Sequence, residues 1–245
     1  MNHTEIIFVI DKSGSMLHLA GDTIGGFNGF IESQKALDGK ATLTTILFDS
    51  EWKILHDGVD IREVKHMTTS DYYAGGMTAM LDAIGETINR VQERHDELGE
   101  EKPDSVIFVI TTDGEENSSR KFKKSDIEKM IKHQTNGHGW KFMFLGANMD
   151  AVKEANSLGI SADRTVNYSY TAQGTSAVYD TVDCLTASVR NCTFDDSITL
   201  ASAYADCLGS NEAKCTVDAA KAYTDIDLEG CISTLCSCVD AASIS

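Results

Sequence analysis

The chain has 245 residues, of which 42% are hydrophobic and 24% are charged, a balance typical of globular proteins. Its 38 Asp and Glu residues outnumber 21 Lys and Arg, and the net charge of −17 argues against nucleic acid or an anionic membrane as a main partner, because phosphate would be repelled. No apolar stretch is long enough to span a bilayer, and the N-terminus lacks the pattern of a secretory signal, so a cytoplasmic location is expected.

The first part of the chain combines strand and helix patterns. Residues 5–10 form a continuous apolar run, which is typical of a strand buried on both faces of a parallel sheet. Apolar residues at helical spacing follow between Phe27 and Leu37, and residues 41–48 then alternate as in a strand. Residues 52–59 are expected to pair with that strand as a hairpin, because the connection is too short for a crossover helix.

The rest of the chain continues this alternation after a loop over residues 62–76. Helices are predicted over residues 78–98, 125–131, 151–158 and after Thr171, and strands over residues 105–110, 140–146 and 164–168. Ser125 is expected to be the N-cap of its helix, over Glu128. The alternation predicts an α/β sandwich of three layers, with a mostly parallel central sheet and helices on both faces.

Polar oxygens follow two of the predicted central strands. Asp11-x-Ser13-x-Ser15 comes after the first strand, and Thr112-Asp113-Gly114 comes after the strand over residues 105–110. A third piece, Gly75-Gly76-Met77-Thr78, leads a threonine into the start of a helix. Because sites in α/β folds form outside the carboxyl ends of central strands, we expect these three pieces to converge there.

Together the three pieces resemble the metal-ion-dependent adhesion site (MIDAS) of the von Willebrand factor A domain, and residues 4–170 resemble that family throughout. The resemblance implies a mostly parallel sheet with one antiparallel edge strand. It also implies one Mg²⁺ or Mn²⁺ ion, with the serines and the threonine binding directly and the aspartates partly through water. The implied ligands are Asp11, Ser13, Ser15, Thr78 and Asp113. Oxygen donors of this kind suit Mg²⁺, which usually retains water as well.

Each piece has a simpler interpretation when it is taken alone. Asp11 could cap a turn, and Thr78 could be only the N-cap of its helix. Asp113 could belong to a nucleotide-binding strand, but no G-x-x-x-x-G-K-[ST] motif accompanies it. A phosphatase of the dehalogenase type would need a second aspartate where Ser13 stands, and residues 11–15 do not form the G-x-S-x-G elbow of a serine hydrolase.

By the resemblance, the residues around this motif form the rim of a site for a protein partner. Glu115 and Glu116 are expected on its rim as solvated side chains, together with Gly76 and Met77. By the resemblance, the function is non-enzymatic: the metal captures an Asp or Glu side chain of another protein. Two alternatives stay open, a metal-dependent hydrolase that uses the same site and an extracellular adhesin that lacks its leader.

The C-terminal part of the chain differs in composition from the rest. All seven cysteines lie at or after Cys184, whereas all seven histidines lie at or before His138. The resemblance ends near Val178, so we expect one domain over residues 1–178 and a helical, cysteine-containing extension over residues 179–245. The extension lacks the C-x2-C pairs typical of zinc sites, and its role cannot be predicted from the sequence.

Overall fold

The computed structural model describes residues 3–194 and 197–209, and its centre is a six-stranded sheet in the order β3-β2-β1-β4-β5-β6. The strands are β1 (His3–Asp11), β2 (Lys40–Phe48), β3 (Trp52–Asp60), β4 (Ser105–Thr112), β5 (Lys141–Ala147) and β6 (Thr165–Tyr168). The edge strand β3 is antiparallel to β2, and the other neighbouring strands are parallel. The fold class predicted from the sequence is confirmed, including the hairpin at the edge.

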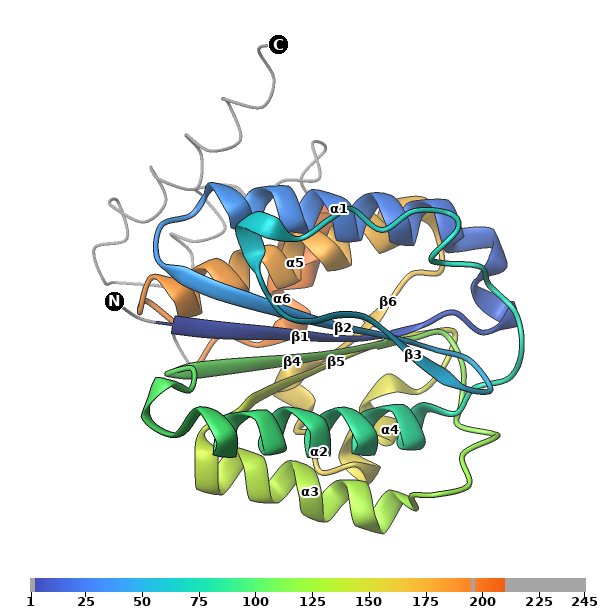
Figure 1. Cartoon of the computed structure of the whole chain (residues 1–245). Coiled ribbons are helices and arrows are strands. Elements are labelled where there is room, and N and C mark those ends of the chain that lie inside the picture. The colour runs from blue at the N-terminus through green and yellow to red at the C-terminus, as the bar shows by residue number, and fades with distance from the viewer. Residues whose placement is uncertain (1–2, 195–196, 210–245) are drawn as a thin grey trace.

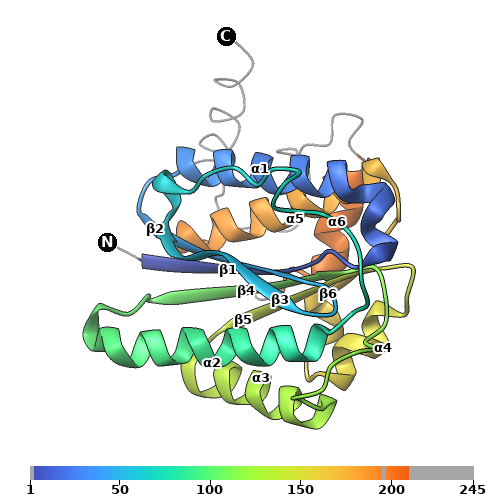
Figure 2. The same cartoon turned by 45° about the vertical axis from the view of Figure 1, so that its right-hand side comes forward.

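Helices cover both faces of the sheet, which gives the molecule three layers (Figure 1). One face carries α1 (Ala20–Ala36), α5 (Ala172–Arg190) and α6 (Leu200–Gly209), and the other carries α2 (Met80–Leu98), α3 (Lys124–His138) and α4 (Ala151–Ser157). The same arrangement is seen after a turn of the molecule (Figure 2). Within the described ranges, no helix combines the length and apolar character that a membrane span requires.

The strand β1 explains why its sequence is a continuous apolar run. Ile6, Phe8 and Ile10 are buried in the core beneath α1 and α5, whereas Ile7 and Val9 are buried in the core beneath α2 and α3. Because successive side chains of a strand point to opposite faces, a strand covered on both faces places consecutive apolar residues in both cores. The central strand therefore binds the two helical layers together.

The start of α3 differs from the sequence prediction. The helix begins at Lys124, with Lys123 as its N-cap, so the expected cap at Ser125 is wrong. The backbone N–H of Lys123 donates to Oδ2 of Asp126 at 3.1 Å. The side chain of Asp126, three residues after the N-cap, thus accepts the hydrogen bond of the N-cap backbone N–H.

The helix α5 passes through residue 178, where the sequence predicts the end of the first domain. Beyond this point Val182 is buried in the core shared with α1, and the buried Arg190 donates to the carbonyl of Gln34 at 2.5 Å. The packed structure therefore continues past residue 178. The division into two domains stays a prediction, because residues 210–245 and their four cysteines lie outside the described part of the chain.

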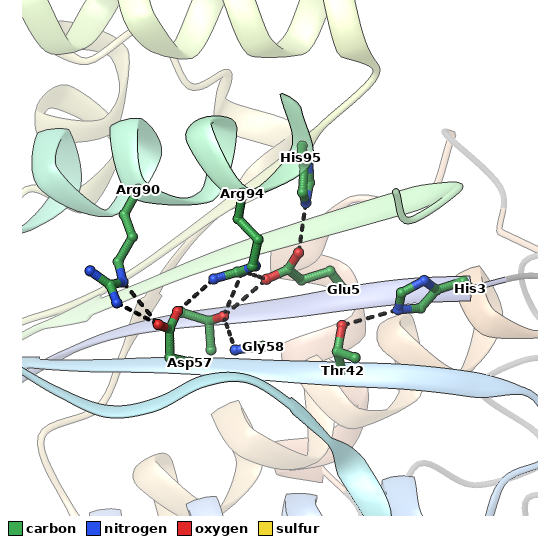
Figure 3. A network of polar contacts seen from close by, with 9 residues as sticks. His3, Glu5, Thr42, Asp57, Gly58, Arg90, Arg94 and His95 are labelled. Atoms are coloured by element: carbon green, nitrogen blue, oxygen red, sulfur yellow. Dashed lines mark hydrogen bonds and ion pairs between the residues drawn. The ribbon is translucent and has the colours of Figure 1, made fainter. Parts of the chain in front are cut away.

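A buried carboxylate, that of Glu5, stands directly before the apolar residues 6–10 of β1 (Figure 3). Oε1 of Glu5 pairs with the Arg94 guanidinium and accepts from the Thr44 hydroxyl at 2.9 Å, while Oε2 lies 2.7 Å from Nε2 of His95. Arg94 also reaches Oδ1 of Asp57 on β3 at 2.5 Å. One charged network therefore joins α2 to three neighbouring strands, and the charge on Glu5 is compensated inside the protein.

The buried histidine of β3 is expected to make the stability of the fold depend on pH. His56 is buried, with Nδ1 at 3.1 Å from Oγ1 of Thr45 and Nε2 at 3.1 Å from the carbonyl of Lys65. Burial lowers the pKa of His56 from its ordinary value of 6.5, so the fold favours the neutral ring. Its stabilisation is therefore complete above pH 6.5 and is lost as the pH falls below that value.

We expect His56→Gln to lose less unfolding free energy than the wild type between pH 7.5 and pH 5.5, as measured by urea unfolding at each pH. The same replacement at His133, whose side chain is exposed, serves as the control and is expected to keep the wild-type slope. Parallel pH profiles for the wild type and His56→Gln would contradict this prediction.

Candidate metal centre

The carboxyl end of β1 holds Asp11 in a fixed position next to β4. The side chain is fully buried, and Oδ1 accepts from the backbone N–H of Ser13 at 2.7 Å. Oδ2 accepts from the hydroxyl of Thr112 at 2.7 Å. The parallel register, which places Ile10 opposite Thr111, brings these strand ends together. Asp11 is therefore positioned by the sheet itself.

The second carboxylate of the candidate centre has one oxygen without a partner. The hydroxyl of Ser15 donates to Oδ1 of Asp113 at 2.6 Å and lies 3.1 Å from the hydroxyl of Ser13. Oδ2 of Asp113 is buried and has no hydrogen-bond partner among the described residues. A buried polar oxygen without a partner lowers the stability of the fold unless a hydrogen bond or a charge compensates it. Ser15 is exposed, so the centre lies at the surface of the protein.

The third segment brings Thr78 to the same place. Gly76 has a φ of +76°, which favours glycine, and its carbonyl accepts from the N–H of Gly14 at 3.2 Å. A Cβ atom on Gly114 would lie 3.8 Å from Oγ1 of Thr78 and 3.9 Å from Oγ of Ser15, so the three segments meet around this glycine. The N-cap of α2 is Ala79, which removes the simpler interpretation of Thr78 as the cap.

The loop after β4 contributes to the start of α2, and this changes the role of Glu116. One carboxylate oxygen of Glu116 accepts from the N–H of Leu81 at 2.9 Å, and the other accepts from the N–H groups of Ser118 and Ser119. The expectation that Glu116 is solvated is therefore wrong, because its carboxylate joins the loop to the helix. Its place on a partner-binding rim stays a prediction. Glu115 is exposed, as expected for a rim residue.

Several residues that sequence reasoning did not single out support the centre. The hydroxyl of Tyr72 donates to the carbonyl of Asp11 at 2.5 Å, and the hydroxyl of Tyr170 donates to the carbonyl of Ser15. Lys12 forms an ion pair with Asp49. These contacts join residues far apart in the chain, and no local pattern signals them.

The electrostatics of the centre favour a cation. Burial raises the pKa of Asp11 to about 6, although the hydrogen bonds from Thr112 and Ser13 oppose the shift and the charge of Asp113 adds to it. Burial also raises the pKa of Asp113. Two carboxylates buried close together are stabilised by a positive charge between them. The ammonium group of Lys12 is already paired with Asp49, so a metal ion is a suitable source of this positive charge.

The donor set fits a hard divalent cation. The five side chains offer only carboxylate and hydroxyl oxygens, the donors that Mg²⁺ and Mn²⁺ accept. Within the described residues, no group of three or more His, Cys, Asp and Glu side chains is placed to hold a metal, and the candidate centre combines two carboxylates with three hydroxyls instead. Oδ2 of Asp113 is buried without a hydrogen-bond partner in the described part of the chain and is free to bind such an ion, so the residues present fit a divalent cation.

Solved structures of von Willebrand factor A domains match this fold. Proximal thread matrix protein 1 from the mussel byssus, with a zinc occupied MIDAS motif, is 16% identical with a TM-score of 0.52, over 76% of this chain and 46% of that one. A von Willebrand factor type A protein from Catenulispora acidiphila is 13% identical with a TM-score of 0.51, over 76% and 43%. The manganese-loaded TRAP protein from Plasmodium vivax is 18% identical with a TM-score of 0.50, over 69% of each chain.

These comparisons establish the fold of the chain. It has the fold of a von Willebrand factor A domain, as the sequence resemblance implies. The matched region spans less than half the length of the mussel and Catenulispora proteins. No protein-family model matches the chain, and no curated protein matches it.

Proposed function

We propose that the chain is a protein-binding module that depends on a divalent cation. Asp11, Ser13, Ser15, Thr78 and Asp113 hold one Mg²⁺ or Mn²⁺ ion, which binds an Asp or Glu side chain of a partner protein. The buried, unpartnered oxygen of Asp113 is the observation that carries this proposal. The zinc and manganese in the mussel and Plasmodium structures support a divalent cation in this fold.

Each group of the centre has a separate task. The bound cation supplies positive charge and a coordination position for an external carboxylate. Hydrogen bonds from Ser13 and Thr112 hold the carboxylate of Asp11 in place at the ends of β1 and β4. The hydroxyls of Ser13, Ser15 and Thr78 add oxygen donors without adding negative charge. The cation therefore still attracts a further carboxylate. Ser15 is exposed, so a partner can reach the centre.

Three polar side chains beside the centre are engaged in other contacts. A hydrolase that uses this site needs a nucleophile or general base with an available functional group. Lys12 is paired with Asp49, and the hydroxyls of Tyr72 and Tyr170 donate to backbone carbonyls. We therefore propose a non-enzymatic role, and the net charge of −17 favours a protein over nucleic acid or an anionic membrane as the partner.

Thermal melting with Mg²⁺ or Mn²⁺, compared with chelator, tests the metal centre. A cation at 100 times its dissociation constant is expected to stabilise the folded protein by about 2.7 kcal/mol, provided that the unfolded chain does not bind it. Affinity capture with magnesium or with chelator, followed by mass spectrometry, tests the partner. Identical melting curves with both cations and with chelator would refute the proposed centre.

A further inference from the structure

Large apolar side chains are exposed around the candidate centre. Five such side chains are exposed in the described part of the chain: Leu17, Tyr73, Met77, Leu98 and Val152. The most exposed are Tyr73 at 78%, Leu17 at 59% and Met77 at 52%. Isolated exposed apolar residues are common on proteins, but a group of them beside a site indicates an interaction surface. Leu98, in contrast, lies at the opposite end of α2.

The three most exposed side chains belong to the loops that form the centre. Leu17 lies two residues after Ser15, in the turn of 3-10 helix over Gly14–Leu19, and Met77 immediately precedes Thr78. The N–H of Gly14 joins this turn to the loop that contains Tyr73 and Met77 through the carbonyl of Gly76. Both segments lie at the edge of the sheet where β1 and β4 end (Figures 1 and 2). We call Leu17, Tyr73 and Met77 the apolar rim.

Charge restricts what can bind at this rim. The chain has a net charge of −17, and the exposed Glu51 and Glu115 lie in the turn after β2 and the loop after β4, at the same edge. The exposed Arg120 and Lys123 lie further along that loop, towards the start of α3. A partner segment with several acidic residues would be repelled by this field, although a single carboxylate would be attracted to the cation. Apolar neighbours of that carboxylate would meet the apolar rim and remove its surface from water.

We infer that the apolar rim selects a partner segment in which one Asp or Glu is flanked by large apolar residues and no second acidic residue is near. This inference rests on the proposed function, because the cation must be present to hold the acidic residue. The apolar contacts then give the specificity that the cation alone does not provide. Replacing one rim side chain is expected to weaken binding about tenfold, an effect between that of a neutral contact and that of a dominant anchor.

A phage-displayed library of random heptapeptides with a fixed central Asp or Glu, selected on the full chain in Mg²⁺ or in chelator, tests the inference. We expect the Mg²⁺-dependent peptides to be enriched in Leu, Ile, Phe and Met beside the fixed residue and depleted in Asp and Glu. Binding of the best peptide is expected to weaken about tenfold in Tyr73→Ser and in Met77→Ser. Leu98→Ser, at the opposite end of α2, is the matched control and is expected to bind normally.

Three results would overturn the inference. They are Mg²⁺-dependent peptides without apolar enrichment, no Mg²⁺-dependent peptides, and a dimer of this chain that Tyr73→Ser dissolves, which would assign the rim to a second copy. Melting of the wild type and of Tyr73→Ser with Mg²⁺ is measured in parallel. A missing shift in the wild type means that the proposed metal centre has failed, whereas a normal shift without apolar selection means that only the inference has failed.

Discussion

Replacing Asp113 with alanine is expected to abolish stabilisation by Mg²⁺ or Mn²⁺ and to leave the metal-free protein at least as stable as the wild type. Oδ2 of Asp113 is buried without a partner in the described residues, and burial raises the pKa of Asp113, so its charged form costs stability when no cation is bound. Ser15, which donates to Oδ1, is exposed and can turn to water. The wild type should gain about 2.7 kcal/mol at 100 times the dissociation constant, and the variant none.

The control for this experiment is Glu115→Ala. It removes the same charge from the same loop, but the side chain is exposed and belongs to no proposed ligand set. Melting of the three proteins with cation and with chelator separates a specific ligand from a general effect of negative charge. A shift of wild-type size in Asp113→Ala would contradict the assignment of Asp113 as a ligand, and a loss in both variants would indicate a general charge effect.

The convergence of the centre could be predicted because it depends on the sheet. Asp11 ends β1 and Asp113 follows β4, two strands with apolar runs at their centres, and parallel strands bring their carboxyl ends to one edge. The structure places β1 and β4 side by side, and Ser15 on one loop reaches Asp113 on the other. Whether the five side chains bind a metal remains a prediction, whereas the proximity of these loops is observed.

The polar details could not be predicted because their partners are distant in the chain. The N-terminus of α2 is satisfied by Glu116 and Ser119, from a loop more than thirty residues away, so no local capping signal marks it. For the same reason the sequence predicts a solvated side chain at Glu116, whereas its carboxylate accepts from the N-terminus of the helix. Glu5 similarly stands at the start of an apolar run, and its partners Arg94 and His95 lie about ninety residues further along. A pattern read from residues close together in the sequence does not reveal such pairs.

Arg94→Met is expected to destabilise the protein by about 3–5 kcal/mol, the usual cost of removing one partner of a buried ion pair. Glu5 is 1% exposed, so its carboxylate cannot recover the lost interaction from water. The methionine keeps much of the apolar length of arginine but cannot pair with Glu5 or donate to Thr44. His95 and Thr44 still contact the carboxylate, which favours the lower end of the range. Urea unfolding at pH 7, with the m-value compared between proteins, measures the effect.

Arg90→Met is the matched control, because Arg90 lies one turn earlier on α2 and pairs with Asp57 at 2.5 Å. Both side chains of that pair are substantially exposed, so its loss is expected to cost at most about 1 kcal/mol. The double variant Glu5→Gln with Arg94→Met removes the charge together with its partner and should be less destabilised than the sum of the two single variants. Equal losses in Arg94→Met and Arg90→Met would show that the buried position of Glu5 does not determine the strength of the network.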